Sequence, residues 1–267
     1  MASPEKKPTR RAIVAASALA PLMPFLASCA QVSESSLTKA PGVLRIGTYF
    51  VNPPFEYIDK GERVGFEVDL MNEIARRLSL RPEFVNTQWE TILGEMQRGD
   101  YDCIVGGITI TPAREKTLAW STPYMTTTLS LVVDGRRSPG IRGIGDFRNA
   151  SVGVQAATTD YDIAKVMQAR GQIGSIKVYP FDRIADAMVD LAAGRITAVM
   201  KVYPVAAWLA RQTPGLRIAA QVPDDPQPLG IGVSKSNPAL LTRINAALAE
   251  MRGDGAYARI AEKWGVP

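Results

Sequence analysis

The sequence predicts an α/β protein of two lobes, each a mainly parallel sheet flanked by helices. Short apolar strands alternate with amphipathic helices, as in parallel sheets. This alternation starts at residue 43, is interrupted near residue 130 and starts again at residue 151. A second interruption lies near residue 225. We therefore expect residues 43–130 and 226–267 to form lobe 1 and residues 131–225 to form lobe 2.

In lobe 1, the segment Val43–Thr48 has strand character, and residues 70–80 carry apolar side chains at helical spacing. The other elements expected in this lobe are strands over 81–85, 101–106 and 229–233 and helices over 92–97, 237–251 and 256–264.

In lobe 2 the same criteria predict another alternating series. The expected elements are strands over 151–154, 176–179 and 196–200 and helices over 160–170 and 184–193. Residues 129–135 and the proline-rich residues 222–228 are expected to cross between the lobes. Because ligands in open α/β sheets bind beyond the carboxyl ends of the strands, two facing lobes predict a shared cleft.

The first 28 residues read as a signal peptide. A basic segment that ends at Arg11 precedes the apolar run from Ala12 to Leu26. The residues that follow, Leu26-Ala27-Ser28-Cys29, resemble the bacterial lipobox, which implies cleavage and lipidation of Cys29. An ordinary small-residue cleavage site before a cysteine is the alternative. Residues 29–42 are polar and predict a flexible tether, so we expect an exported protein anchored to a membrane by its lipid.

Composition excludes several classes of function. The formal charge is +5, and without the four basic residues and one acidic residue of the leader it falls to +2. This charge is too small to indicate nucleic-acid binding. The chain has no histidine, which excludes histidine-dependent nucleophilic catalysis and histidine metal sites. Only Cys29 and Cys103 are present, so thiolate zinc sites are excluded too, and we predict neither a metal nor a cofactor.

The segment from Gly106 to Lys116 has the residues of a carboxylate site. Gly106 and Gly107 follow an apolar strand and let a ligand approach the backbone. Thr109 offers a hydroxyl group, and the guanidinium of Arg114 can donate two parallel hydrogen bonds to a carboxylate. The alternative is a plain helix start with Thr111 as N-cap, in which Arg114 is a solvated first-turn residue.

Several sequence blocks together resemble the family 3 solute-binding proteins, the extracytoplasmic receptors of amino-acid ABC transporters. The resemblance covers residues 43–267 and implies a periplasmic-binding-protein type 2 fold with a ligand cleft between two lobes. The blocks are Leu44-Arg45-Ile46-Gly47-Thr48, Pro54-Phe55, Val64-Gly65-Phe66-Glu67-Val68-Asp69-Leu70, Gly99-Asp100-Tyr101-Asp102, Ile108-Thr109-Ile110-Thr111 through Arg114, Ser121-Thr122-Pro123-Tyr124 and Gly194-Arg195-Ile196-Thr197-Ala198.

The resemblance implies that Arg114 binds the ligand carboxylate with help from Thr109. It also implies that the opposite lobe contributes Thr158 and Thr159 from a turn that opens a helix. Hydroxyl and backbone donors at a helix N-terminus suit an anion, which agrees with that role. A helix N-cap is the alternative role for Thr159, and the two roles are compatible.

Three residues match positions that line the ligand site in this family. Trp89 lies where many members place an aromatic wall, with a core tryptophan as the alternative. Tyr49 and Asn52 lie in the first loop, where the family often presents a carboxylate and an aromatic residue, and neither residue type is kept.

The chain departs from the family where an aspartate usually pairs with the ligand ammonium. Here the sequence reads Met200-Lys201-Val202. Asp160 is a candidate for the missing charge, with a first-turn helix acid as its alternative role. Lys201 either receives a second anionic group of the ligand or is a surface lysine. The ligand is therefore an amino acid or a related organic acid, such as a dicarboxylate or keto acid.

The sequence thus predicts a monomeric, non-enzymatic receptor that delivers a small carboxylate to the permease subunits of an ABC transporter. The alternative is an enzyme on the same fold, similar to cyclohexadienyl and arogenate dehydratases. Such an enzyme needs a general acid from the second lobe, and residues 201–208 contain no Asp, Glu or His.

Overall fold

Two five-stranded sheets organise the part of the chain that the computed structural model describes, residues 1–3 and 37–267. The first sheet has the strand order β5-β1-β6-β13-β7 and the second β10-β9-β11-β8-β12. In each, three neighbouring strands are parallel and the other two pair antiparallel. The predicted α/β class with two sheets is confirmed. The predicted signal peptide beyond residue 3, Cys29 and residues 29–36 of the predicted tether lie outside the described residues.

Strands from distant parts of the sequence meet in each sheet. The first contains β1 (Val43–Thr48), β5 (Arg81–Asn86), β6 (Cys103–Ile104), β7 (Ala119–Trp120) and β13 (Gly232–Val233). The second contains β8 (Met125–Asp134), β9 (Ser151–Gln155), β10 (Ser175–Tyr179), β11 (Ala198–Val202) and β12 (Leu216–Leu229). A small third sheet contains β2 (Val51–Asn52), β3 (Glu56–Asp59) and β4 (Glu62–Val64).

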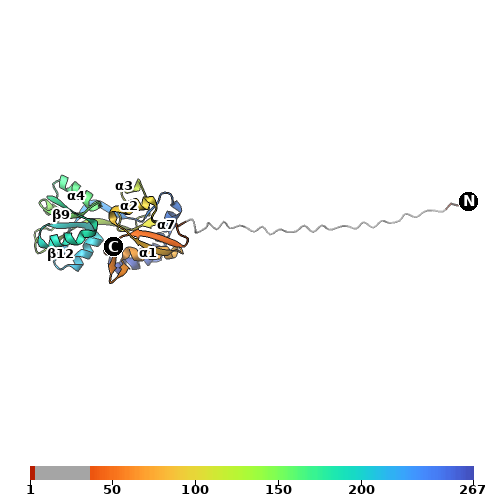
Figure 1. The fold of residues 1–267 in the computed structure, drawn as a ribbon, viewed down its shortest axis with the longest axis horizontal. Helices are drawn as coiled ribbons and strands as arrows, with labels where there is room; N and C mark the ends of the chain where they lie inside the picture. Colours follow the sequence, from red (N-terminus) through yellow and green to blue (C-terminus); the bar gives the residue numbers. More distant parts are fainter. Residues whose placement is uncertain (4–36) are drawn as a thin grey trace. The chain divides into compact units, whose positions relative to one another are not determined.

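Helices pack against both large sheets, as Figure 1 shows for α1, α2 and α7 with the first sheet and α4 with the second. The α-helices are α1 (Phe66–Arg77), α2 (Trp89–Arg98), α3 (Pro112–Glu115), α4 (Thr159–Ala169), α5 (Ile184–Ala193), α6 (Tyr203–Gln212), α7 (Pro238–Gly253) and α8 (Ala256–Trp264). Two short 3-10 helices are η2 (Ile144–Phe147) and η3 (Phe181–Arg183).

Residues 37–267 belong to one compact unit with a continuous apolar core. Its fully buried side chains include Ile46 of β1 and Leu70 of α1 on the side of the first sheet, and Val152 of β9 and Met200 of β11 in the second sheet. Cys103 is also fully buried in this core, and burial raises the pKa of its thiol.

Several predicted elements differ from the structure for local reasons. Helix α1 begins at Phe66 rather than residue 70, directly after Gly65, whose φ is 139°. A Cβ atom at Gly65 would lie 2.1 Å from the Phe55 carbonyl oxygen, so glycine is required there. Helix α2 begins at Trp89 rather than residue 92, and strand β6 is confined to Cys103–Ile104.

The proline-rich residues 222–228 lie inside strand β12, although the sequence reads there as an irregular crossing. Strand β12 is at the edge of its sheet and pairs antiparallel with β8, with register shifts between Ile218 and Ala220 and between Gln221 and Pro226. Prolines are tolerated in an edge strand because its outer N–H groups have no partner strand. Residues 129–135, the other expected crossing, are largely in β8 itself.

Candidate functional site

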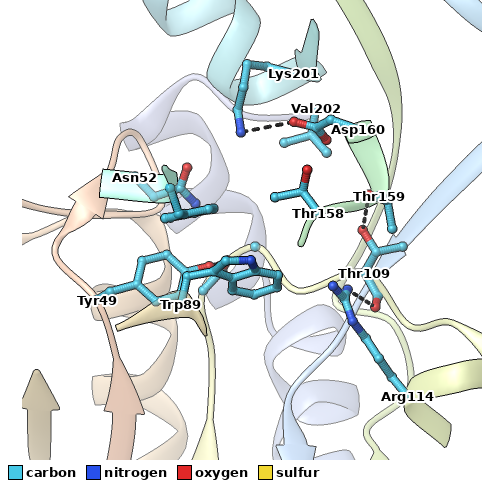
Figure 2. Close-up of a pocket in the computed structure, with 13 residues that line it drawn as sticks. Tyr49, Asn52, Trp89, Thr109, Arg114, Thr158, Thr159, Asp160, Lys201 and Val202 are labelled. Carbon is cyan, nitrogen blue, oxygen red and sulfur yellow. Dashed lines mark hydrogen bonds and ion pairs between the residues drawn. The ribbon is translucent and has the colours of Figure 1, made fainter. Parts of the chain in front are cut away.

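The ten ligand-site residues that the sequence predicts all line one cavity of about 30 Å³. It lies where loops and helix starts that follow the first sheet's strands meet those of the second (Figure 2). The predicted residues that line it are Tyr49, Asn52, Trp89, Gly107, Thr109, Arg114, Thr158, Thr159, Asp160 and Lys201. Gly106, Phe181 and Val202 complete the lining.

The glycine pair after β6 forms one wall of the cavity. Gly106 and Gly107 have φ angles of 154° and 60°, which side-chain-bearing residues rarely adopt. A Cβ atom at Gly106 would lie 2.5 Å from the Tyr49 hydroxyl, and one at Gly107 would lie 3.1 Å from the Phe55 ring. The Gly107 N–H donates to Glu67 Oε1 at 2.9 Å. The backbone here is therefore fixed by close packing and a buried carboxylate.

Thr109 and Arg114 are held together beside this wall. The Arg114 guanidinium donates from Nη1 to the Thr109 carbonyl oxygen at 2.8 Å and lies 5.0 Å over the Trp89 ring. Arg114 makes no other side-chain hydrogen bond to a described residue, so further N–H groups are available to a ligand. Burial lowers the pKa of Arg114, but an arginine remains charged at neutral pH.

The short helix α3, which contains Arg114, sets the position of this residue. Thr111 is its N-cap and accepts from the Arg114 backbone N–H at 3.2 Å, and Pro112 occupies the first turn. Thr111 is therefore a helix N-cap, as the alternative interpretation expects, and Arg114 in the same helix still lines the cavity.

The N-terminus of α4 forms the opposite wall. Thr158 is the N-cap: its hydroxyl accepts from the Tyr161 N–H at 3.3 Å and donates to the Gln155 carbonyl oxygen at 2.7 Å. The N-cap alternative for Thr159 is therefore wrong, because its neighbour takes that place. The Thr159 hydroxyl faces that of Thr109 at 3.5 Å, as Figure 2 shows.

Lys201 and Asp160 form a buried ion pair in the second half of the cavity. Their exposed fractions are 5% and 2%, and Lys201 Nζ lies 3.2 Å from Asp160 Oδ2. Lys201 Nζ also donates to Gln155 Oε1 at 2.5 Å. Lys201 is on β11 and Asp160 in the first turn of α4, so the pair links two elements of the second sheet's half. The surface-lysine alternative for Lys201 is therefore wrong.

The aromatic residues at the cavity make specific polar contacts. Trp89, the first residue of α2, donates from Nε1 to the Ala157 carbonyl oxygen at 3.2 Å. The Tyr49 hydroxyl donates to the Gly106 carbonyl oxygen. Burial, followed by the nearby Glu56 and Glu67, raises the pKa of Tyr49, so the phenol stays protonated.

Two carboxyl groups lie fully buried behind the cavity wall. Glu67 accepts from the Gly107 N–H and the Tyr124 hydroxyl. Glu56 has both oxygens buried without a hydrogen-bond partner among the described residues. Burial, followed by the charge of Glu67, raises the pKa of Glu56 well above its usual value. Burial therefore favours the neutral form of Glu56, and the Glu67 carboxyl group orders the Gly107 backbone.

The lining has one uncompensated charge. Arg114, Asp160 and Lys201 are its charged side chains, and the last two neutralise each other. A cationic guanidinium with N–H groups free for a ligand can bind a carboxylate. Among the described residues, no group of three acidic or cysteine side chains could hold a metal ion. No helix in residues 37–267 is long and apolar enough to cross a membrane.

Sequence reasoning missed Phe181 and Val202 as lining residues. Val202 ends β11 next to Lys201, and Phe181 follows Pro180 just after β10. Both lie at the carboxyl ends of parallel strands, the edge where ligands of open α/β sheets bind. That rule would have identified them.

The family model of the bacterial extracellular solute-binding proteins, family 3, matches residues 44–267. A curated relative, the ABC transporter arginine-binding protein 1 of Escherichia coli (strain K12), is 30% identical over 83% of this chain and 90% of its own length. The L-cystine-binding protein TcyJ of the same strain is 27% identical over 85% of this chain and 84% of its own length.

Solved structures resemble this fold at similar sequence identity. An ancestral arginine-binding protein bound to arginine is 34% identical with a TM-score of 0.76, over 84% of this chain and 98% of the other. The ancestral amino acid-binding protein AncCDT-1, a precursor of cyclohexadienyl dehydratase, is 33% identical with a TM-score of 0.74, over 84% and 95% of the two chains.

Proposed function

Because the chain belongs to the family 3 bacterial extracellular solute-binding proteins, we propose that it is the receptor of an ABC transporter for a small carboxylate. The ligand is an amino acid or a related organic acid. Relatives that are named for arginine and cystine support this class of ligand.

The observation that carries the proposal is the single uncompensated cation at the cavity. Arg114 has one N–H bound to the Thr109 carbonyl oxygen and faces the Thr109 and Thr159 hydroxyls. We propose that its remaining N–H groups bind the ligand carboxylate, with Thr109, Thr159 and the Gly107 backbone around it. The positive end of the α4 dipole favours the same anion.

We propose that the ligand is captured by closure of two lobes, residues 43–130 with 226–267 and residues 131–225. Contacts between the first- and second-sheet sides support a closed arrangement: Thr109 with Thr159, and Trp89 Nε1 with the Ala157 carbonyl oxygen. Strands β8 and β12 run side by side and supply the connections about which the lobes would move. The permease would then recognise the closed form.

The other groups of the lining define how the rest of the ligand is held. We propose that Asp160 and Lys201 act as a neutral pair that offers one acceptor and one donor beyond the carboxylate. Asn52 adds an amide to the same cavity, and Tyr49 and Trp89 form its aromatic wall. An α-amino acid would use the free Asp160 oxygen for its ammonium, and a keto acid would accept a hydrogen bond from Lys201.

We propose that the protein is a receptor and not an enzyme. Dehydration of a prephenate-type substrate needs a group that donates a proton to the leaving hydroxyl. Of the groups at the cavity that carry a proton, the Lys201 ammonium is held by Asp160 and Gln155, and the Tyr49 hydroxyl already donates to the Gly106 carbonyl oxygen. Formation of phenylpyruvate from prephenate by the purified protein would overturn this part of the proposal.

We also propose that the protein is exported, tethered to a membrane through lipid on Cys29 and monomeric. The family, which is extracellular, supports export. Mass spectrometry of the protein from a native membrane fraction tests the lipid. A diacylglyceryl adduct at Cys29 is expected, and an unmodified chain cut elsewhere would contradict it.

Calorimetry on an Arg114→Ala variant tests the carboxylate site. A thermal-shift screen with L-alanine, L-arginine, L-glutamate, pyruvate and 2-oxoglutarate first identifies a bound probe, because a ligand of the native state raises apparent stability. Arg114→Ala should weaken its affinity by about 100-fold or more, and Arg114→Lys should recover only part. Arg98→Ala, which removes an exposed arginine paired with Asp100, is the control and should bind as the unaltered protein does. Unchanged affinity in Arg114→Ala would refute the assignment.

A further inference from the structure

Three aromatic rings form a cluster beside the ligand cavity. They come from the loop after β1 (Tyr49), the start of α2 (Trp89) and the 3-10 helix η3 (Phe181). Phe181 stacks on Trp89 with ring centroids 5.2 Å apart and meets Tyr49 edge-on at 4.8 Å. Tyr49 and Trp89 lie 5.8 Å apart. All three side chains are buried, with exposed fractions of 3%, 7% and 5%.

A second cavity is lined by the same cluster. Its volume is about 340 Å³, against about 30 Å³ for the ligand cavity, and the two share Tyr49, Trp89 and Phe181 as lining residues. The shared rings are therefore the partition between them. The other residues that line the second cavity are Phe50, Val51, Asn86, Thr87, Gln88, Glu90 and Asp182.

Phe181 is the ring in this partition whose side chain makes no hydrogen bond. Tyr49 is bound through its hydroxyl to the Gly106 carbonyl oxygen and Trp89 through Nε1 to the Ala157 carbonyl oxygen. Phe181 is positioned through its backbone, with its N–H bound to Glu90 Oε1 at 3.4 Å and its carbonyl oxygen accepting from Gln155. Its ring can therefore be truncated without breaking a hydrogen bond, and the contact with a charged group that is lost is the one to Lys201 Nζ, 5.7 Å from the ring centroid.

The charge of the second cavity is acidic. Glu90 and Asp182 line it, and no basic side chain is among its lining residues. A ligand chain that entered from the carboxylate site would bring its far end toward these two carboxylates. A guanidinium or ammonium at that end would be favoured over a neutral or anionic group.

We propose that Phe181 determines the length of the ligand by closing the carboxylate site against the second cavity. The protein as it stands accepts short carboxylates, and the second cavity is a subsite for the cationic end of a longer one that opens when the Phe181 ring is removed. This inference rests on the proposed carboxylate receptor, because Arg114 must hold the head of both short and long ligands.

Calorimetry with matched short and long probes tests the proposal. The first pair is L-alanine and L-arginine, and the second is pyruvate and 5-guanidino-2-oxopentanoate. One pair has an α-amino group beside the carboxylate and the other an α-keto group, so the effect of length can be measured with either. The unaltered protein should prefer the short member of the pair that it binds. Phe181→Ala should shift this preference toward the long member by at least about tenfold, because two further methylene groups leave water and the guanidinium meets the acidic lining. Phe181→Leu, which disturbs packing less, should give a smaller shift in the same direction.

Two further variants separate the partition from other effects. Phe50→Ala is the matched control, because Phe50 lines the second cavity but not the ligand cavity, and it should leave the preference unchanged. Glu90→Gln in the Phe181→Ala background keeps an acceptor for the Phe181 N–H but removes a charge. It should weaken L-arginine binding several-fold and leave the neutral analogue L-citrulline unaffected.

The outcomes distinguish the two proposals. Equal affinity of the unaltered protein for short and long probes would overturn the length rule, and so would folded Phe181→Ala and Phe181→Leu variants that bind the short probe without gain for the long one. If no probe with either head group binds the unaltered protein, the carboxylate receptor itself is refuted, and the length rule with it.

Discussion

Replacement of Lys201 by methionine should lower the free energy of unfolding by about 3–5 kcal/mol, the usual cost of leaving a buried charge without its partner. Lys201 and Asp160 are 5% and 2% exposed, and the Nζ–Oδ2 distance is 3.2 Å. In Lys201→Met, the Asp160 carboxyl group loses its partner in a position that water scarcely reaches. Methionine has a similar length, so the change removes charge and hydrogen bonds more than volume.

Urea unfolding of four proteins measures the effect: the unaltered chain, Lys201→Met, Asp160→Asn and the double variant. For a chain of this size the loss in Lys201→Met corresponds to a decrease in Tm of about 6–20 °C. The double variant should be more stable than Lys201→Met, because neither uncompensated charge remains buried. Lys165→Met is the control, since the exposed pair of Lys165 with Asp162 should contribute about 0–1 kcal/mol.

Two results would refute this reasoning. A loss below about 1 kcal/mol in Lys201→Met would mean that water or a shifted side chain solvates Asp160. A double variant that loses the sum of the two single losses would mean that the residues do not interact, because contacting pairs depart from additivity. Either result would also remove the neutral pair from the proposed ligand site.

Two further predictions concern the wall behind Gly107. The raised pKa of Glu56 means that the folded state holds a proton that the unfolded chain releases near its ordinary pKa. Stability from this group is therefore complete below that ordinary pKa and falls as pH rises toward the raised value, by about 1.4 kcal/mol per pH unit. The chain lacks histidine, so Glu56→Gln should flatten the dependence of thermal stability on pH above the ordinary pKa of glutamate, and an unchanged slope would contradict the assignment. Gly107→Ala should cost about 1–3 kcal/mol in urea unfolding and weaken ligand binding, because φ is 60° and the new Cβ would press on Phe55. Gly140→Ala, with open space around its Cβ, is the control, and equal losses in both variants would disprove the strain.

Much of the fold follows from local sequence. Helices α5 and α8 begin and end where the periodicity predicts. A glycine directly follows each helix and marks its end. Helix α6, which begins at Tyr203, was not predicted, although Pro204 is compatible with a helix in its first turn. The prolines of β12 argue against a strand in the sequence. They are tolerated because β12 lies at the edge of its sheet. The sequence around β12 could not predict this strand, because whether a strand lies at a sheet edge depends on neighbouring strands that are distant in the sequence.

In the candidate site, too, some features follow from the local sequence and others depend on contacts between distant residues. The sequence around Arg114 specifies its own geometry, through a glycine pair with positive φ, an N-cap at Thr111 and a first-turn proline. Lys201 and Asp160 are 41 residues apart in the sequence, and whether they attract a ligand or each other is decided only when β11 packs beside α4. Their mutual neutralisation leaves Arg114 as the uncompensated charge on which the proposed carboxylate site rests.

The same distinction explains why ligand length could not be predicted from sequence. Phe181 follows a strand in one half of the fold, whereas the two rings that it meets, Tyr49 and Trp89, come from the other. None of the three positions alone indicates a partition, because an aromatic side chain after a strand is usually a core residue. The partition exists only when the halves meet, so its removal should change which ligands fit the proposed carboxylate site at Arg114.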